Sequence, residues 1–169
     1  MQAPTLETER LRLRPWRNDD LDVFAAFMAD GARTQFIGGP LSRGDTWRRI
    51  AMFIGHWQLR GFGNWVIEEK ASGALAGYTG LWKPEGWPEP EVMWGLLPAY
   101  GGRGFATEAA ARARAYAFED LKWPTAVSYI ASKNTPSQRV AERLGARYEG
   151  VAELKGVTVD VWRHPSPSN

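Results

Sequence analysis

The chain has 169 residues, of which 44% are hydrophobic and 24% are charged, as expected for one soluble globular domain with a sizeable core. It contains no cysteine, which excludes disulfides, thiolate nucleophiles and zinc–sulfur sites, and its two histidines lie too far apart in the sequence to favour a metal site. The net charge of +2 is weak support for an anionic ligand and does not indicate a nucleic-acid-binding surface.

Residues 1–7 lack the basic start and the apolar core of a signal peptide, and no apolar run is long enough to span a membrane. These features predict a cytoplasmic protein with no membrane partner. The sequence has no internal repeat and no second-domain boundary. We therefore expect residues 1–169 to form a single domain with flexible tails at 1–5 and 165–169.

Hydrophobic periodicity predicts both strands and helices in the first half of the chain. Charges that alternate with leucine predict a strand, and apolar residues spaced three or four apart predict two helices after it. An antiparallel hairpin follows, and then a proline-rich loop whose central Trp87 is placed equally well to meet a ligand or to fold back on the loop. In order, these elements are expected at 8–15, 18–29, 43–59, 64–69, 74–82 and 83–90.

The middle of the chain is organised around a hydrophobic strand, a glycine-rich turn and an alanine-rich helix, running from Val92 to about Ala117. Gly101, Gly102 and Gly104 permit positive φ and a close approach of the backbone to a ligand. A helix start leaves amide N–H groups unpaired and attracts phosphate, and Arg103 adds a guanidinium at the turn. These features predict a phosphate-binding loop. The alternative is a glycine-rich connector with no function.

Two well-known phosphate loops do not fit this turn. The chain has no Gly-x-x-x-x-Gly-Lys-[Ser/Thr] run, which excludes a P-loop. Thr107 stands where a dinucleotide-binding Gly-x-Gly-x-x-Gly motif needs its third glycine.

The last third of the chain reads as a short buried strand at 126–132, a helix, and a hairpin at about 146–153 and 157–164. For the helix, Thr135 and Gln138 predict a capping box, and Gly145 predicts its end. The apolar spacing along this helix places the Ser137 hydroxyl on the buried side of its first turn.

Three stretches carry a resemblance to one family: Thr8-Glu-Arg-Leu-Arg-Leu-Arg14, Gly101-Gly-Arg-Gly-Phe-Ala106 and the segment from Asn134 to Ala146 with Ser137, Leu144 and Gly145. Together they resemble the GCN5-related N-acetyltransferases, and within them the RimJ/RimL-like branch that acts on ribosomal proteins. The resemblance implies a single α/β (α+β) domain. Its mixed, mostly antiparallel sheet would have about seven strands, splayed between the fourth and the fifth, with about four helices.

The same resemblance implies acetyl-coenzyme A as cofactor and a primary amine as acceptor. Leu96 and Leu97 would offer backbone groups to the pantetheine arm, and Asn134 would contact the arm from the far side. The diphosphate would be held by the amides of the turn, namely those of Gly102, Arg103, Gly104, Phe105, Ala106 and Thr107. No metal is implied.

For catalysis the amine must lose a proton, and a carboxylate can accept it. Glu91 is the candidate because the branch commonly carries a glutamate at this point of the strand; the alternative is an acid with no catalytic role. Its loss is expected to matter most at low pH. Many family members supply a tyrosine to protonate the departing thiolate, but Ala141 stands in that position. Ser137 is the substitute, as an acid or only as a hydrogen-bond partner of the arm.

We therefore predict an acyltransferase that works by direct attack in a ternary complex, with a protein N-terminus or a small-molecule amine as acceptor. A non-catalytic acyl-coenzyme A-binding module of the same fold is the alternative. The identity of the acceptor and the choice between monomer and homodimer stay open at this stage.

Overall fold

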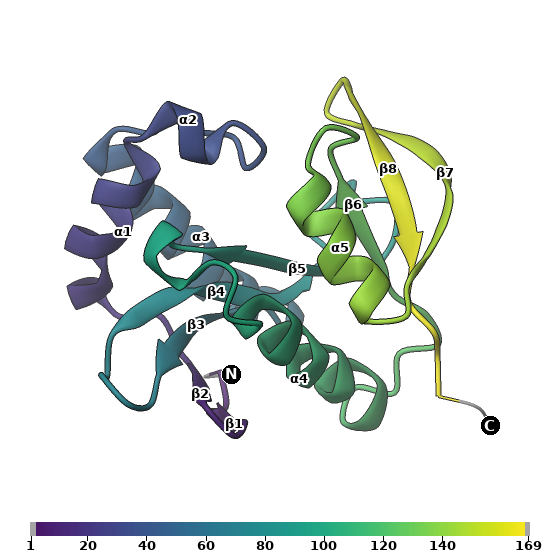
Figure 1. Cartoon of the computed structure of the whole chain (residues 1–169), viewed down its shortest axis with the longest axis horizontal. Coiled ribbons are helices and arrows are strands. Elements are labelled where there is room, and N and C mark those ends of the chain that lie inside the picture. Colours follow the sequence, from purple (N-terminus) through teal and green to yellow (C-terminus); the bar gives the residue numbers. More distant parts are fainter. Residues whose placement is uncertain (1–2, 168–169) are drawn as a thin grey trace.

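In the computed structural model, which describes residues 3–167, the chain forms one eight-stranded sheet with helices on both faces (Figure 1). The strands are β1 (Leu6–Glu7), β2 (Leu11–Arg14), β3 (Asn64–Glu69), β4 (Leu75–Trp82), β5 (Glu91–Leu96), β6 (Val127–Ile130), β7 (Arg147–Leu154) and β8 (Val157–Arg163). The helices are α1 (Leu21–Met28), α2 (Gly31–Thr34), α3 (Arg43–Arg60), α4 (Phe105–Glu119) and α5 (Thr135–Arg143), with 3-10 turns η1 (Asn18–Asp20) and η2 (Pro98–Tyr100).

The sheet has the order β1-β2-β3-β4-β5-β6-β8-β7, and every neighbouring pair is antiparallel except β5 and β6. These two parallel strands share a single register pair, Glu91 with Val127, beyond which they diverge. The predicted mixed sheet, splayed between its fourth and fifth expected strands, is confirmed. The two-residue strand β1 and the short helix α2 are additions to the predicted elements.

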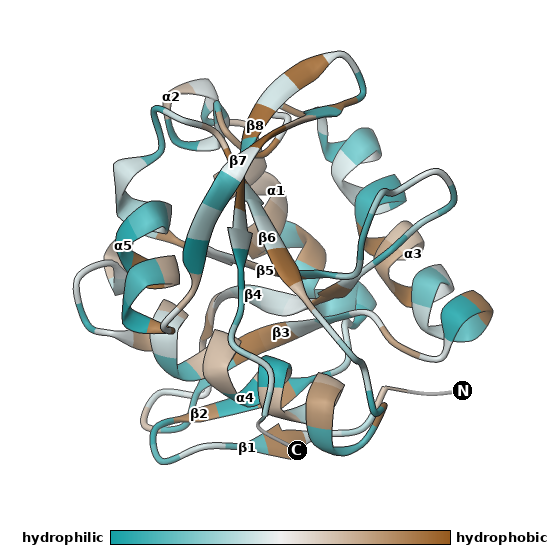
Figure 2. Ribbon diagram, turned by 90° about the vertical axis from the view of Figure 1, so that its right-hand side faces the viewer, coloured by the Kyte–Doolittle hydropathy of each residue, from teal (hydrophilic) through white to brown (hydrophobic). Residues whose placement is uncertain are grey.

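Two large apolar clusters pack the helices against the two faces of the sheet. One lies under α4, where small side chains let the helix approach the strands closely: Ala106, Ala109, Ala110, Ala113 and Ala117. The other lies under α1 and α3 and is rich in aromatic residues, including Trp16, Phe24, Phe53, Tyr78 and Trp82. Figure 2 shows apolar segments in β3 and β6, and apolar and polar segments that alternate along α3. The close packing of α4 fixes its first turn beside the end of β5.

Some local predictions were wrong. The predicted capping box of α5 is absent: Asn134, not Thr135, caps the helix by accepting a hydrogen bond from the Ser137 N–H at 3.3 Å. The Gln138 side chain instead donates to the Ser132 carbonyl at 2.9 Å. Among the three glycines of the central turn, Gly101 has φ −64° and needs no glycine for its conformation.

The two tails expected at 1–5 and 165–169 fall partly outside the described residues. Within them, the Pro4 carbonyl accepts a hydrogen bond from the Trp65 indole at 2.7 Å. In the part of the chain that the structure describes, no helix combines the length and the apolarity needed to cross a bilayer.

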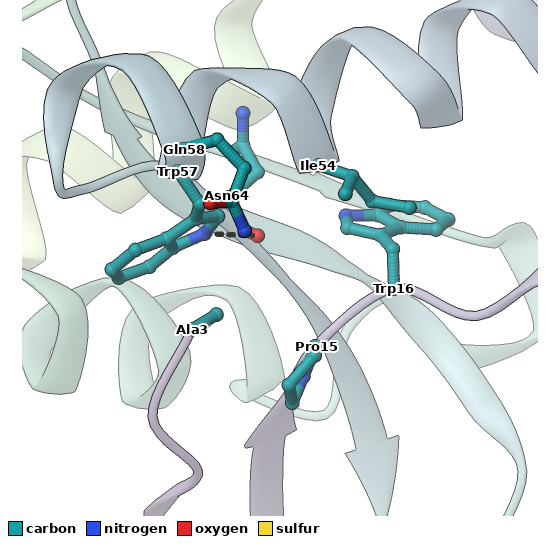
Figure 3. Close-up of a pocket in the computed structure, with 7 residues that line it drawn as sticks. All are labelled: Ala3, Pro15, Trp16, Ile54, Trp57, Gln58 and Asn64. Atoms are coloured by element: carbon teal, nitrogen blue, oxygen red, sulfur yellow. Dashed lines mark hydrogen bonds between the residues drawn. The ribbon is translucent and has the colours of Figure 1, made fainter. Parts of the chain in front are cut away.

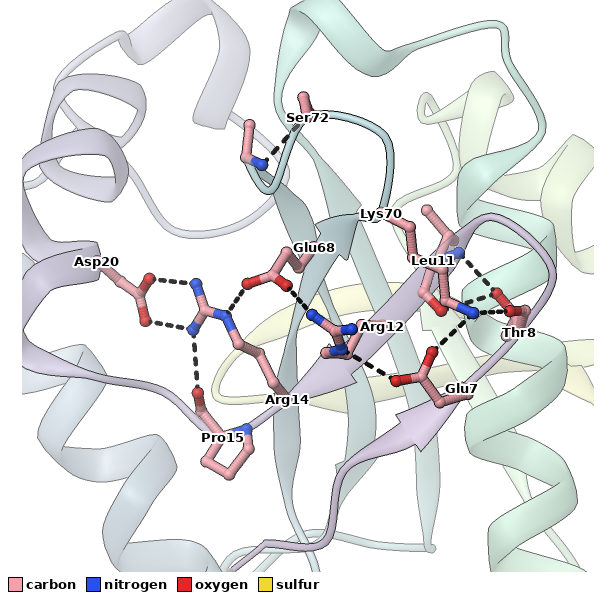
Figure 4. Close-up of polar contacts among 11 residues, drawn as sticks. Glu7, Thr8, Leu11, Arg12, Arg14, Pro15, Asp20, Glu68, Lys70 and Ser72 are labelled. Carbon is pink, nitrogen blue, oxygen red and sulfur yellow. Dashed lines mark hydrogen bonds and ion pairs between the residues drawn. The ribbon is translucent and has the colours of Figure 1, made fainter.

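A buried ion network ties the first helix to the sheet (Figure 4). The Arg14 guanidinium contacts Asp20 at 2.7 Å and Glu68 at 2.5 Å, and Arg12 contacts Glu68 from the exposed side at 2.8 Å. Asp20 also accepts a hydrogen bond from the Arg17 N–H at 2.8 Å. Asp20 lies in the η1 turn, and α1 begins directly after it at Leu21, where the sequence predicted a helix capped by Asn18 or Asp19.

Candidate active site

The glycine-rich turn presents a row of free amides at the start of α4. Gly102 and Gly104 have φ of +75° and +78°, in the left-handed region that favours glycine. Within residues 3–167, the N–H groups of residues 102–107 donate to no acceptor, whereas Glu108 N–H begins the helical bonding to the Gly104 carbonyl. The Thr107 hydroxyl is also buried without a partner among these residues. Such a set of donors at a helix N-terminus is suited to a diphosphate.

The side chain of Arg103 is engaged in contacts with other side chains. Its guanidinium forms an ion pair with Glu69 and lies 4.3 Å from the centre of the Phe105 ring. Arg10 donates to the Arg103 carbonyl at 2.9 Å and is itself paired with Glu108. These side-chain contacts hold the turn in place. The backbone N–H of Arg103 stays available to a ligand, whereas its guanidinium is already paired with Glu69.

The end of β5 exposes backbone groups to the splay at alternate residues. Leu97 donates its N–H to the Ala76 carbonyl at 2.8 Å, and its own carbonyl accepts from Tyr100. Because hydrogen bonding alternates along an antiparallel strand, Trp94 and Leu96 must direct their backbone groups away from β4 and towards β6. Of the two predicted contacts for a pantetheine arm, the structure therefore leaves Leu96 available, and Trp94 joins it.

A chain of buried polar groups joins β5 to β6 at the apex of the splay, which is the point near Glu91 and Val127 where the two strands begin to diverge. The Ser128 hydroxyl donates to the Val92 carbonyl at 2.5 Å and so bridges β6 to β5. His164 Nε2 lies 2.8 Å from the same hydroxyl, and Arg114 of α4 lies 3.4 Å from His164 Nδ1. Since the hydroxyl proton is already used, Nε2 must be the protonated nitrogen. Burial, together with the nearby Arg114 charge, lowers the pKa of His164 to about 3, so the ring is neutral.

Glu91 lies at this apex, on the face of β5 that is covered by α1 and α3. Its side chain is buried and accepts a hydrogen bond from the Trp87 indole at 2.9 Å, with the Tyr129 N–H at 3.5 Å from its second oxygen. Burial raises the pKa of Glu91 to about 8, although the two hydrogen bonds oppose this shift. A carboxylate with a pKa in this range is suited to accept a proton near neutral pH.

Trp87 thus folds over Glu91 rather than standing free in its loop. Its ring also meets Tyr129 edge-on at 6.1 Å and has the Lys155 ammonium 5.8 Å from its centre. Two acids at the end of the neighbouring strand β3 are engaged elsewhere: Glu68 pairs with Arg14, and Glu69 pairs with Arg103.

Ser137 and Asn134 lie together at the start of α5, across the splay from β5 (Figure 1). Ser137 is half-buried, and its hydroxyl has no hydrogen-bond partner among residues 3–167. The Asn134 side chain serves as the cap of α5, which leaves its amide N–H₂ group free to donate. No contact joins either residue to Glu91 in the described part of the chain.

The structure adds residues that the sequence did not indicate. Trp94 packs against both the α4 cluster and the small cluster of β6 and α5, so it forms the floor between the diverging strands, and its indole N–H is buried without a partner among residues 3–167. Tyr78 lies on the opposite face, beside Gly95. Nothing in the sequence around either aromatic residue distinguishes it from a core residue.

Two hollows lie outside this arrangement. A cavity of about 330 Å³ sits between α3 and the start of the η1 segment, and Figure 3 shows Trp57 and Trp16 on its two sides. None of the predicted site residues lines it. An open groove of about 600 Å³ runs between α1, α2 and the end of β5, where Leu97 and Pro98 form one wall.

A family model described as acetyltransferase (GNAT) domain matches residues 10–147 of the chain, which includes the splay, the glycine-rich turn and the start of α5. The chain belongs to this GNAT acetyltransferase family. Its fold and its class of enzyme, an acyltransferase, are therefore those that the sequence predicted.

Relatives of this GNAT chain extend over nearly its whole length. An acetyltransferase structure from Agrobacterium tumefaciens is 35% identical with a TM-score of 0.89 and covers 98% of this chain and 96% of its own. The uncharacterized N-acetyltransferase p20 of Bacillus licheniformis is 28% identical over 94% of this chain and 93% of its own. RimL, a ribosomal alpha-N-protein acetyltransferase solved with coenzyme A, shares the fold with a TM-score of 0.79 at 16% identity, over 96% of this chain and 98% of its own.

Proposed function

We propose that the protein transfers the acetyl group of acetyl-coenzyme A to a primary amine in a ternary complex. The observation that carries the proposal is the pairing of free amides at the start of α4 with a splayed β5–β6 edge and a buried carboxyl group at its apex. A diphosphate fits the amides of residues 102–107, because they are donors at a helix N-terminus without acceptors of their own within residues 3–167. The buried Thr107 hydroxyl supplies a further group in need of a partner.

We assign the binding of acetyl-coenzyme A to the following groups of the chain. The amides of Gly102 to Thr107 would hold the diphosphate, and the backbone of Leu96 and Trp94 would align the arm, with Asn134 donating from α5. When bound, acetyl-coenzyme A supplies an activated acyl group and a good leaving group.

On the other side of the splay, Glu91 would accept a proton from the incoming ammonium, directly or through water. Trp87 and the Tyr129 N–H would hold its two oxygens in place. Burial makes Glu91 a stronger base than an exposed glutamate, which narrows the gap to an alkyl amine with a pKa near 10. Ser137 would donate a hydrogen bond to the departing sulfur from the start of α5.

Calorimetric titration with acetyl-coenzyme A, followed by a thiol-release assay over a panel of primary amines, tests the proposal. We expect one carrier molecule to bind per chain and thiol release to depend on the amine. Absence of carrier binding would refute the assignment of the loop. Binding without any amine-dependent thiol release would refute the transfer reaction.

A further inference from the structure

Arg49 is a half-buried cation on the face of the sheet that α1 and α3 cover, which we call the acceptor side because Glu91 lies on it. It lies on the inner side of α3, in line with the buried residues Phe53 and His56. Its Nη1 donates to the Ile37 carbonyl at 2.8 Å, and no acidic side chain of residues 3–167 forms an ion pair with it. A guanidinium has five N–H donors, so most of those of Arg49 are unused.

Arg49 differs in this respect from Arg14, a buried arginine on the same face of the sheet. Arg14 is buried between Asp20 and Glu68, which together use most of its donors (Figure 4). Removing a charge from water without a partner is costly, so a retained unpaired arginine calls for an explanation. Burial also lowers the pKa of Arg49, although the group stays protonated at neutral pH.

Tyr78 connects Arg49 to the reaction site. Its ring lies against Gly95 of β5: a Cβ at Gly95 would come 2.6 Å from the ring and 2.8 Å from the hydroxyl. The Tyr78 hydroxyl makes no hydrogen bond within residues 3–167. Ile37, whose carbonyl accepts from Arg49, packs in the same apolar cluster as Tyr78. Gly95 lies on the same face of β5 as Glu91, so these residues share one neighbourhood. The charges of Arg49 and Glu91 also both act on the Tyr78 phenol, in opposite directions.

The surroundings place this neighbourhood on the acceptor side rather than the carrier side. Glu91, Met93 and Gly95 alternate along the face of β5 that is opposite to α4, and Met93 belongs to the same apolar cluster as Tyr78 and Ile37. Arg49 supports the loop after α2 through the Ile37 carbonyl. In Figure 1 this loop projects towards the half of the molecule that contains β6 and α5. A molecule that reaches Glu91 along this face would pass the free donors.

We propose that Arg49 and the Tyr78 hydroxyl bind a carboxylate of the acceptor, which is therefore a small amine that carries a carboxylate on the same molecule. The proposal rests on the transfer reaction proposed above and specifies its acceptor. A guanidinium and a carboxylate match each other in shape and can form two parallel hydrogen bonds. The same positive charge disfavours acceptors with several ammonium groups, such as polyamines.

Matched pairs of acceptors test this inference. Phenylalanine and leucine are compared with phenethylamine and isopentylamine, and 3- to 6-carbon ω-amino acids are compared with alkylamines of equal length. We expect at least one carboxylated amine to exceed its partner about ten-fold in kcat/KM, a difference of ~1.4 kcal/mol. R49M, which keeps an unbranched stem, should abolish this preference while the rate with the plain amine changes less than about two-fold.

Two controls separate recognition from a structural role. R48M changes a neighbouring, exposed arginine of α3 that pairs with Asp45, and it should retain the preference. R49K should retain part of it, because the charge stays while the bidentate geometry is lost. Calorimetry of the favoured amino acid, without the carrier, should show binding to the wild type and a loss of at least ten-fold in R49M.

The outcomes separate this inference from the transfer reaction itself. If acetyl-coenzyme A binds and plain amines react as well as their carboxylated partners, the inference fails and the transfer reaction stands. A preference that persists in R49M, or the absence of reaction with every carboxylated probe, also overturns it. An acidic residue near a peptide N-terminus offers the same carboxylate, so Ala-Asp and Ala-Asn peptides form a further pair. Preference for the Asp peptide, with no free amino acid accepted, would overturn the assignment to a small molecule.

Discussion

The two sides of the β5–β6 splay are built from different kinds of groups. On the α4 side, the groups that face the site are main-chain amides and carbonyls, placed by one contiguous segment from β5 to the first turn of α4. On the α1–α3 side the groups proposed to meet the acceptor are side chains, among them Glu91, Trp87, Tyr78 and Arg49, which come from four separate segments. Backbone groups suit a carrier that is the same in every reaction, whereas side chains can be changed to select an acceptor.

The largest effect should follow from disrupting the backbone side. In G104V, a β-branched residue replaces a glycine at φ +78°, and its first carbon would come 3.4 Å from Arg10. The turn must change its conformation, and the free amides then lose their common direction. We expect coenzyme A affinity to fall by about 100-fold or more, equivalent to ~2.7 kcal/mol, as measured by calorimetry.

G61V is a matched control for this experiment. Gly61 has φ +76°, a Cβ added there would meet no atom within 4 Å, and the residue ends α3 far from the turn in sequence. Its replacement carries the same backbone strain and should reduce stability while leaving coenzyme A affinity unchanged. Equal losses of affinity in the two variants would show that global stability, not the turn, controls binding.

The sequence predicted the α4 side of the splay, which offers backbone groups, much better than the α1–α3 side, which offers side chains. The reason is physical. A strand, a glycine turn and an alanine-rich helix are read from contiguous residues, so the free amides of 102–107 were predictable. Glu91 was predicted from the resemblance, because the branch commonly carries a glutamate at this point of the strand, and its catalytic role stays a prediction. Arg49 and Tyr78 gave no signal, because each acts through a neighbour distant in the sequence, namely Ile37 and Gly95. The cap of α5 was misassigned because Asn134 and Thr135 are adjacent and both are good caps.

The second prediction removes the carboxylate from the side-chain side. With a pKa of about 8, Glu91 is mostly protonated below that pH, so the fraction of the enzyme that can use it as a base falls as the pH falls. E91Q should therefore reduce kcat/KM by about 100-fold or more above pH 8, and the deficit should shrink as the pH falls towards 6. This reverses the dependence expected from the sequence, in which the loss of Glu91 matters most at low pH because the amine is most protonated there.

A pH series of kcat/KM from 6 to 10, with one amine, measures this difference. E89Q is the control, because Glu89 lies two residues away but pairs with Arg163 instead of facing the apex. Parallel profiles of E91Q and the wild type across the whole range would remove Glu91 from proton transfer. A profile for E89Q that follows the wild type would show that the effect belongs to the apex.

The third prediction concerns the junction that joins the two sides. S128A would leave the Val92 carbonyl and His164 Nε2–H without their shared partner in a buried position. We expect a loss of ~2 kcal/mol in the free energy of unfolding, measured by urea denaturation. S132A, on the same segment but with its hydroxyl paired to Asp160 on the other side of β6, should cost less, because that serine is exposed. Equal costs would mean that the Ser128 bridge adds nothing beyond an ordinary surface hydrogen bond.

The smallest effect tests whether Asn134 belongs to the backbone side as a helix cap, a carrier contact or both. N134A removes the acceptor of the Ser137 N–H and should cost ~1 kcal/mol of stability, whereas N134D keeps an acceptor and should cost little. N134D nevertheless loses the amide donor and adds a negative charge beside the proposed arm. If Asn134 contacts the arm, N134D will bind coenzyme A more weakly at unchanged stability. If both variants keep wild-type affinity, Asn134 acts only by positioning α5, and with it the Ser137 hydroxyl.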